Sequence, residues 1–164
     1  MSKILDFFKT KREIIKRDFN RVLPVGELVS DRWEKARFLG FGAGSSVYDS
    51  SVILGDVVVG LNTWVGPNTI LDGSGKLIIG DNCSVSAGVQ IYSHDSVQWA
   101  VSGGEMPYEY DKTEIGSNCY LGPNTIIAKG VILGSETIVG ANSFVKESFP
   151  KGSKIAGNPA KLIG

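Results

Sequence analysis

One histidine, His94, occurs among the 164 residues of this chain, and its side chain is the one best suited to acid–base chemistry. Imidazole titrates near neutral pH, so it can accept a proton from an attacking hydroxyl or amine and pass it to a leaving group. A carboxylate that holds the ring tautomer would complete such a base. Asp95, the next residue, is the first candidate for this role, and Glu105 is the second.

His94 lies near the start of a long segment, residues 92–114, that interrupts an otherwise regular pattern. A loop of this length in a compact repeat protein is usually either functional or disordered. The aromatic residues of the segment argue against disorder. We therefore expect the chemistry here, with Tyr92, Trp99 and Glu105 as candidate contacts for a substrate. Trp33, Trp64, Trp99 and Tyr110 could stack on a sugar or a base, but core packing explains at least half of these four aromatic residues equally well.

The regular pattern is a branched aliphatic residue at every sixth position. Its members include Phe41, Val47, Ile53, Val59, Val65 and Leu71, and later Ile115, Leu121, Ile127, Leu133, Val139 and Val145. The frame slips by two residues at positions 72–76 and then resumes. A six-residue repeat is typical of a parallel β-helix, in which three strands and turns close one triangular coil. An ordinary β-sandwich has a period of two, which does not fit this run.

The repeat also predicts which side chains fill the prism. The aliphatic residue points to the axis, where it is hidden from water. The compact residue four positions later, such as Thr63 or Cys119, points inward beside a corner. A glycine directly after the aliphatic residue, such as Gly122, is expected to let the backbone turn tightly.

Two further regions lie outside the repeat. Residues 2–20 carry apolar residues near one face of a predicted helix and many basic residues elsewhere. We expect this helix, within an N-terminal helical cap of residues 1–36, to cover or brace the first coil, although a basic amphipathic helix can also rest on a membrane. The β-helix is predicted over residues 37–148. Residues 149–164 are expected to leave it as a tail that covers its far end.

Composition excludes several classes of function. Lys and Arg number 17, as do Asp and Glu, so the net charge of zero gives no reason to expect a nucleic acid partner. Cys83 and Cys119 both fall on inward positions, which favours small core residues over a disulfide or a metal pair and suits a reducing cytoplasm. No segment reaches transmembrane length and none reads as a targeting peptide. We expect a cytoplasmic protein without stable membrane insertion and without a metal.

The repeat, the loop opening Ile91-Tyr92-Ser93-His94-Asp95 and the ending Ala156-Gly157-Asn158-Pro159-Ala160-Lys161 together resemble the hexapeptide-repeat acyltransferases. The resemblance covers about residues 38–164 and is closest to small acetyltransferases of bacterial surface-polysaccharide and nucleotide-sugar pathways. It implies an all-β, left-handed parallel β-helix, a homotrimer, and acetyl-CoA bound in the groove between neighbouring prisms. It also implies that His94 is the general base and that a sugar is the acceptor.

The resemblance extends to the expected cofactor contacts. The pantetheine arm would pass Gly122, Ala128, Gly140 and Ala141, where small side chains allow a close approach. A backbone N–H of the coil wall would hold the carbonyl oxygen as charge develops. Cations for the nucleotide phosphates are expected near the end of the groove. These are Lys146 and Lys161, with Lys151 and Lys154, although Lys146 stands where relatives often carry Thr.

Three alternatives to a sugar N-acetyltransferase make different demands on the sequence. A γ-type carbonic anhydrase has the same fold but needs three histidines for zinc, and this chain has one. A trimeric scaffold or binding module would not need His94 or the aromatic loop. Within the enzyme class, the expected reaction is N-acetylation of a nucleotide-linked amino sugar. The alternative is O-acetylation of a sugar hydroxyl.

Overall fold

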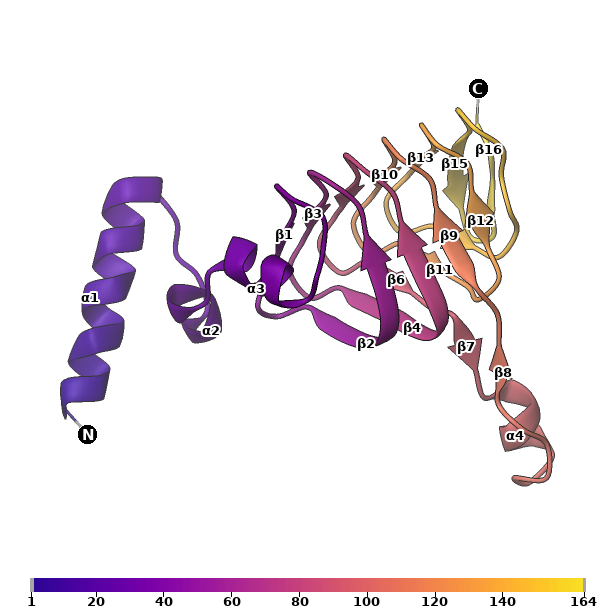
Figure 1. The fold of residues 1–164 in the computed structure, drawn as a ribbon, viewed down its shortest axis with the longest axis horizontal. Helices are drawn as coiled ribbons and strands as arrows, with labels where there is room; N and C mark the ends of the chain where they lie inside the picture. Colours follow the sequence, from indigo (N-terminus) through magenta and orange to yellow (C-terminus); the bar gives the residue numbers. More distant parts are fainter. Residues whose placement is uncertain (1, 164) are drawn as a thin grey trace.

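The six-residue period folds into a left-handed parallel β-helix, shown as a prism of stacked coils in Figure 1. The computed structural model describes residues 2–163. On the first face, each strand pairs in parallel with the next, for example Val47 with Val65. The strands of this face are β1 (Ser46–Val47), β3 (Trp64–Val65), β5 (Ser84–Val85), β10 (Tyr120–Leu121), β13 (Ile138–Val139) and β15 (Lys154–Gly157).

Two long strands, β2 (Val52–Val59) and β4 (Ile70–Ile79), bend around a corner and belong to both remaining faces. The first half of β4 pairs with β6 (Gln90–Ile91), which is followed by β11 (Ile126–Ile127) and β14 (Phe144–Val145). The second half pairs with β9 (Thr113–Ile115), which is followed by β12 (Ile132–Leu133). The resulting triangular cross-section leaves one continuous core along the axis.

The inward positions are occupied as the repeat predicts. Leu71, Leu121 and Val139 are fully buried, and burying one such side chain contributes about 1.5–3 kcal/mol. Most compact residues beside the corners are buried as well, and the hydroxyls of Ser45, Ser51, Thr63 and Thr125 donate to backbone carbonyls, whereas the buried hydroxyl of Thr69 has no partner among the described residues. The thiol of Cys83 donates to the carbonyl of Gly116 at 3.1 Å, and that of Cys119 donates to Gly134 at 3.4 Å. Both cysteines are free thiols.

The expected role of the corner glycines is wrong in one respect. Gly122 does not adopt a positive φ; the left-handed positions nearby are taken by asparagines, such as Asn118 and Asn124. A Cβ on Gly122 would lie 2.5 Å from the backbone nitrogen of Ala141 in the next coil. Glycine is therefore required here because stacked coils approach closely, and the tight turn itself is made by asparagine.

Three helices precede the prism: α1 (Ser2–Phe19), α2 (Val25–Val29) and α3 (Arg32–Phe38). Asp31 caps α3, since its Oδ1 accepts from the backbone N–H of Trp33 at 2.9 Å. The helix that packs against β1 is α3, whereas α1 packs against α2 and stands away from the prism in Figure 1. The expectation that residues 2–20 brace the first coil is therefore wrong, because the shorter α3 already covers that end.

The excursion projects sideways from the prism (Figure 1). It consists of β7 (His94–Asp95), α4 (Val97–Val101) and β8 (Glu109–Tyr110), with β7 and β8 paired antiparallel.

The solenoid also continues beyond its predicted end at residue 148. Strand β15 pairs in parallel with β13 and buries Ile155, and β16 (Ala160–Leu162) then folds back against β15. Among residues 2–163, no helix combines the length and the apolar character needed to cross a membrane.

Candidate active site

His94 sits at the base of the excursion, where the chain leaves β6. Antiparallel pairing places it opposite Tyr110 and places Asp95 opposite Glu109. The imidazole ring lies nearly parallel to the ring of Tyr110, with centroids 5.9 Å apart, and to that of Tyr108 at 6.4 Å. Trp99 meets Tyr108 edge-on at 5.4 Å. Tyr110, Tyr108 and Trp99 therefore form one cluster that begins at the histidine.

The partner of the histidine is Asp72. Nδ1 of His94 lies 2.6 Å from Oδ2 of Asp72, which has no exposed side-chain surface. Asp72 belongs to β4, so the coil below holds the ring that the excursion carries. The His94 side chain itself is 28% exposed, so it is open to a substrate on one side while its inner nitrogen is held.

Asp72 is held in its ionised form by hydrogen bonds. Burial raises the pKa of its carboxyl, but hydrogen bonds from Ser74, Ser93 and His94 outweigh that effect and lower the pKa to about 2. Oδ1 accepts from the hydroxyl of Ser74 at 2.6 Å and from its backbone N–H at 3.0 Å. Oδ2 accepts from the backbone N–H of Ser93 at 3.0 Å.

An ionised carboxylate only accepts hydrogen bonds, so Nδ1 of His94 must be the donor. The neutral ring then carries its free electron pair on Nε2, and that nitrogen can take a proton. The buried charge of Asp72 also stabilises the imidazolium that forms. The pair therefore has the arrangement that a general base requires, with one ring nitrogen held and the other free to take a proton.

The expectation that Asp95 or Glu105 orients His94 is wrong. Adjacent residues of a strand point to opposite faces, and Asp95 is turned away from the ring. Its Oδ1 accepts from the backbone N–H of Val97 at the start of α4, at 3.0 Å. Glu105 is exposed in the excursion, beyond α4.

The missed residue lies where the repeat slips, at Asp72-Gly73-Ser74-Gly75-Lys76. The N–H of Gly75 donates to the hydroxyl of Ser93 at 2.8 Å, and a Cβ on Gly75 would collide with the carbonyl of Ser93. The extra residues of this coil thus support the start of the excursion, which packs directly on them. A polar, glycine-rich slip directly below a long loop is the signal that sequence reasoning could have used.

A hollow of about 440 Å³ opens beside His94. Its floor is apolar, formed by Ile126, Ala128 and Phe144, and its rim carries Asp95 and Lys129. Tyr92 also lines it and is held by a hydrogen bond from its hydroxyl to Gln90 Oε1 at 2.8 Å. Trp99 and Glu105, the other predicted substrate contacts, do not line this hollow.

Lys129 fastens the excursion to the wall of the prism. Its Nζ lies 2.7 Å from Glu109 Oε2, 3.1 Å from Asp111 Oδ2 and 3.6 Å from Asp95 Oδ2. Hydrogen bonds to Glu109 and Asp111 raise the pKa of the lysine, although burial acts against this. Only 17% of the side chain is exposed. One cation therefore links both strands of the hairpin that carries His94, and the rim keeps an excess of negative charge.

The predicted cofactor contacts divide between two corners of the prism. Ala128 and Lys146 stand side by side at the corner next to His94, since Ile127 pairs with Val145. Gly122, Gly140 and Ala141 lie at the preceding corner, where the N–H of Gly122 donates to Val139 and that of Gly140 donates to Ile155.

The remaining lysines lie farther along the prism. Lys161 is in β16, and Lys151 pairs with Glu136 at 2.9 Å. The N–H groups of Gly122, Ala128 and Gly140 all donate to the next coil, so these three groups are not free to hold a carbonyl oxygen. Within residues 2–163, no group of three or more His, Cys, Asp or Glu side chains could hold a metal.

Comparison with known families agrees with the fold and the repeat. The model described as bacterial transferase hexapeptide (six repeats) matches residues 112–147, and the hexapeptide repeat of succinyl-transferase matches residues 56–93. The chain belongs to the hexapeptide-repeat transferase family.

Individual relatives are similar over different parts of the chain. The carnitine operon protein CaiE of Escherichia coli K12 is 32% identical over 124 residues, which are 71% of this chain and 63% of CaiE, so the chain spans a little under two thirds of that relative. WbbJ of the same organism, a putative lipopolysaccharide biosynthesis O-acetyl transferase, is 47% identical over 49 residues, 30% of this chain and 25% of WbbJ. The crystal structure of a maltose O-acetyltransferase from Clostridium difficile 630 superimposes with a TM-score of 0.62 at 28% identity, covering 96% of this chain and 87% of that one.

Proposed function

We propose that this protein is an acetyl-CoA-dependent acetyltransferase that transfers an acetyl group to a hydroxyl of a sugar. The observation that carries the proposal is the buried carboxylate of Asp72 on Nδ1 of His94, at 2.6 Å. A sugar hydroxyl is a weak nucleophile and needs a base at the moment of attack, and this pair supplies one. The names of WbbJ and of the maltose enzyme, both O-acetyltransferases, support the same reaction.

In the proposed reaction, Nε2 of His94 removes the proton from the attacking hydroxyl as its oxygen bonds to the thioester carbon. The tetrahedral intermediate then collapses, the carbon–sulfur bond breaks, and the imidazolium returns the proton to the sulfur of CoA. Asp72 holds the ring and its charge throughout without taking the proton. The products are an acetyl ester and free CoA.

The cofactor and the assembly are part of the proposal. Acetyl-CoA would reach His94 along the corner of Ala128, whose small side chain lies in the hollow. Gly122, Gly140 and Ala141 would flank the arm, and Lys146 and Lys161 would meet phosphates. A homotrimer would place the open hollow against a neighbouring prism, and the acceptor would be a surface-polysaccharide sugar or its nucleotide-linked precursor in the cytoplasm.

N-acetylation of an amino sugar is the second candidate, and the charge at the rim favours it. Asp95, Glu109 and Asp111 surround a single cation, Lys129, and the remaining negative charge would attract the ammonium form of an amine. An amine needs less help from a base than a hydroxyl does. The strongly held Asp72–His94 pair is the reason for placing O-acetylation first.

The test is CoA release measured by a thiol reagent, with acetyl-CoA and a panel of neutral sugars, amino sugars and their nucleotide-linked forms. The acetylated product is then treated with hydroxylamine, which cleaves an ester and leaves an amide intact. Release with a neutral sugar and a labile product supports the proposal. A stable product with an amino sugar supports the second candidate. Acetyl-CoA that neither binds nor reacts would point to a scaffold or binding module.

A further inference from the structure

Helix α1 leaves most of its apolar side chains in solvent. The exposed fraction is 63% for Ile4, 55% for Leu5 and 67% for Phe19. The helix packs against α2, while α3 covers the end of the prism, so α1 is not needed as a cap. Adjacent exposed apolar side chains on one 18-residue helix indicate a surface that binds a partner.

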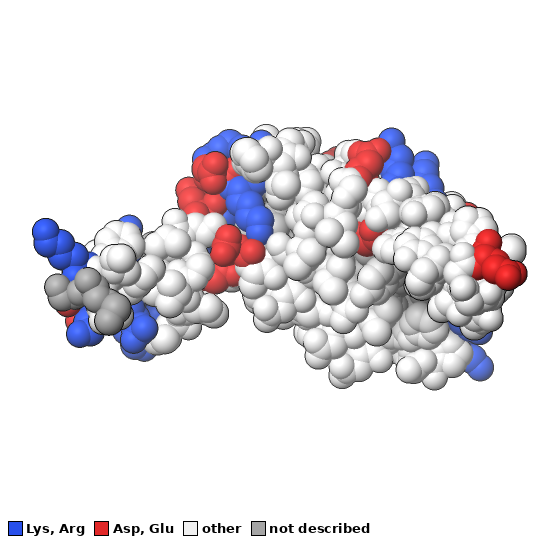
Figure 2. Space-filling model, turned by 90° about the horizontal axis from the view of Figure 1, so that it is seen from below, with Lys and Arg blue, Asp and Glu red and all other residues white. Residues whose placement is uncertain are grey.

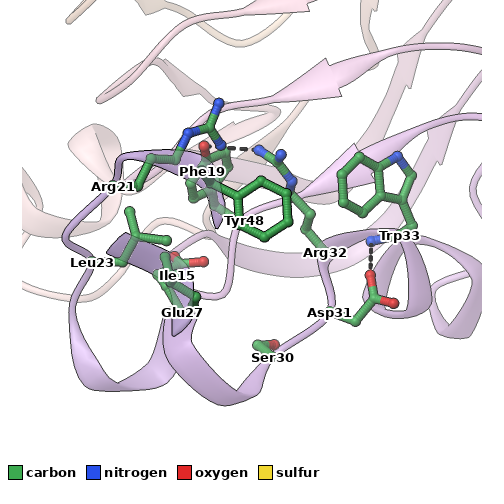
Figure 3. Close-up of a pocket in the computed structure, with 10 residues that line it drawn as sticks. All are labelled: Ile15, Phe19, Arg21, Leu23, Glu27, Ser30, Asp31, Arg32, Trp33 and Tyr48. Atoms are coloured by element: carbon green, nitrogen blue, oxygen red, sulfur yellow. Dashed lines mark hydrogen bonds between the residues drawn. The ribbon is translucent and has the colours of Figure 1, made fainter. Parts of the chain in front are cut away.

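The space between α1 and the prism is not filled. A hollow of about 280 Å³ lies there, with Ile15 and Phe19 on the α1 side and Trp33 and Tyr48 on the other (Figure 3). Arg32 is already engaged within it: its guanidinium lies 4.4 Å from the ring of Trp33 and donates to the hydroxyl of Tyr48 at 2.8 Å. Ile15 is half-buried on this side of α1, whereas Ile4, Leu5 and Phe7 remain exposed and available to a larger surface.

Most charged residues of α1 lie outside its apolar side; the exceptions are Lys11 and Asp18, and Asp18 is paired with Arg17 at 2.6 Å. At 100° per residue, Ile4, Phe8, Ile15 and Phe19 form one apolar stripe. Basic side chains flank the apolar side: Lys3 and Arg17 on one edge, and Lys9, Arg12 and Lys16 on the other. Asp6 and Glu13, seven residues apart, lie on the opposite side. An apolar stripe between basic edges is typical of helices that lie in the interface of a membrane.

Net charge is also divided unevenly between the two ends of the molecule. Residues 1–40 contain ten Lys and Arg against six Asp and Glu, a net charge of +4, whereas residues 41–164 contain seven against eleven, a net charge of −4. Figure 2 shows basic side chains at the end that carries α1. The positive end would be drawn to an anionic surface, and the negative prism would be repelled by it.

The orientation of α1 relative to the prism is compatible with binding to a flat anionic surface. In Figure 1 the helix runs across the axis of the prism at its N-terminal end. A flat surface in contact with α1 along its length would therefore meet the prism end-on. The excursion and the hollow beside His94 lie farther along the prism and would stay open to solvent.

We propose that α1 binds the surface of an anionic lipid bilayer. Its apolar side chains enter the headgroup region, and the flanking lysines and arginines pair with lipid phosphates. The contact is peripheral, since no helix within residues 2–163 is long and apolar enough to cross the membrane. This proposal is independent of the acetyl transfer, because it concerns the opposite end of the molecule and is read out by binding alone.

The test is co-sedimentation of the full chain with vesicles of phosphatidylcholine, alone or with one quarter phosphatidylglycerol. We expect several-fold more protein bound to the anionic vesicles at low salt, with the difference reduced as salt rises. The variant K9E/R12E should lose this preference, and I4N/F7N should bind weakly to both kinds of vesicle. The matched control, K76E/K112E, makes the same charge change on the prism and should bind as the wild type does.

Circular dichroism and sedimentation velocity of each variant keep the result interpretable. Equal binding to neutral and anionic vesicles, or full binding by K9E/R12E, would overturn the proposal. A variant I4N/F7N that changes the oligomeric state while the wild type ignores vesicles would also overturn it, and would assign the apolar face of α1 to a second copy of this chain.

Discussion

His94 and Asp72 are 22 positions apart in the sequence, yet Nδ1 of the histidine lies 2.6 Å from Oδ2 of the aspartate. The two residues come from different coils, and the same carboxylate oxygen also accepts from the backbone N–H of Ser93 at 3.0 Å. Asp72 therefore sets both the orientation of the ring and the path of the chain that enters the excursion. The ring nitrogen that we propose as the base, Nε2 of His94, is therefore positioned by the prism itself.

The variant D72N should lower kcat by about 10²–10⁴. If the amide nitrogen of the substituted side chain donates to Nδ1, the ring proton moves to Nε2 and the base is lost. If the amide oxygen accepts from Nδ1 instead, the negative charge that stabilises the imidazolium is missing. The Kd for acetyl-CoA should stay within a few-fold of the wild type, as measured by calorimetry. The control is D95N, which keeps an oxygen for the N–H of Val97 and should retain most of its activity. Loss of activity in D95N with none in D72N would reverse the assignment of the two aspartates.

Asp72 should also make the free energy of unfolding depend on pH in the acidic range. The pKa of its carboxyl is about 2 in the folded protein, below the ordinary value of 3.8. A depressed folded-state pKa contributes stability that is complete above the unfolded pKa and is lost as the pH falls through the folded value. The difference in Tm between wild type and D72N should therefore be larger at pH 5 than at pH 2.5. A difference that stays constant over this range would show that the carboxylate is not held in its ionised form.

The prism can be predicted from the sequence because the same signal occurs many times. Every coil needs aliphatic residues, such as Leu71 and Val139, at its inward positions. The sequence also predicts the chemistry at His94, which stays a prediction. It does not reveal Asp72, since an inward carboxylate is costly in general and is tolerated here only because Ser74, Ser93 and His94 together satisfy it. Partners of this kind depend on which coils stack, and two residues 22 positions apart on neighbouring coils share no local sequence pattern.

Lys129 should be a positioning residue. The variant K129M removes the cation shared by Glu109 and Asp111, so the hairpin that carries His94 loses its fastening to the wall and three carboxylates lose their partner. We expect kcat to fall by up to about 10²-fold, as a small displacement of a catalytic group can cause. Limited proteolysis should cut the excursion faster than in the wild type. The control K76M breaks a more exposed pair with Asp56 and should change neither measurement.

Ala141 tests the expected path of the cofactor. Its side chain is exposed at the corner that also holds Gly140, so a phenylalanine there would project outward and not into the core. The variant A141F should raise the KM for acetyl-CoA at least tenfold while Tm stays nearly unchanged, since only inward overpacking costs about 1–3 kcal/mol. A43F makes the same outward change in the first coil and should leave KM unaltered. Normal acetyl-CoA binding by A141F would place the groove elsewhere.

The most direct test of the central claim is kcat of H94A with the acceptor identified by CoA release. The account predicts a loss of about 10²–10⁴ in kcat, the usual contribution of a general base, with an unchanged Kd for acetyl-CoA and an unchanged circular dichroism spectrum. Turnover by H94A at the wild-type rate would contradict the assignment of His94 and, with it, the role given to Asp72.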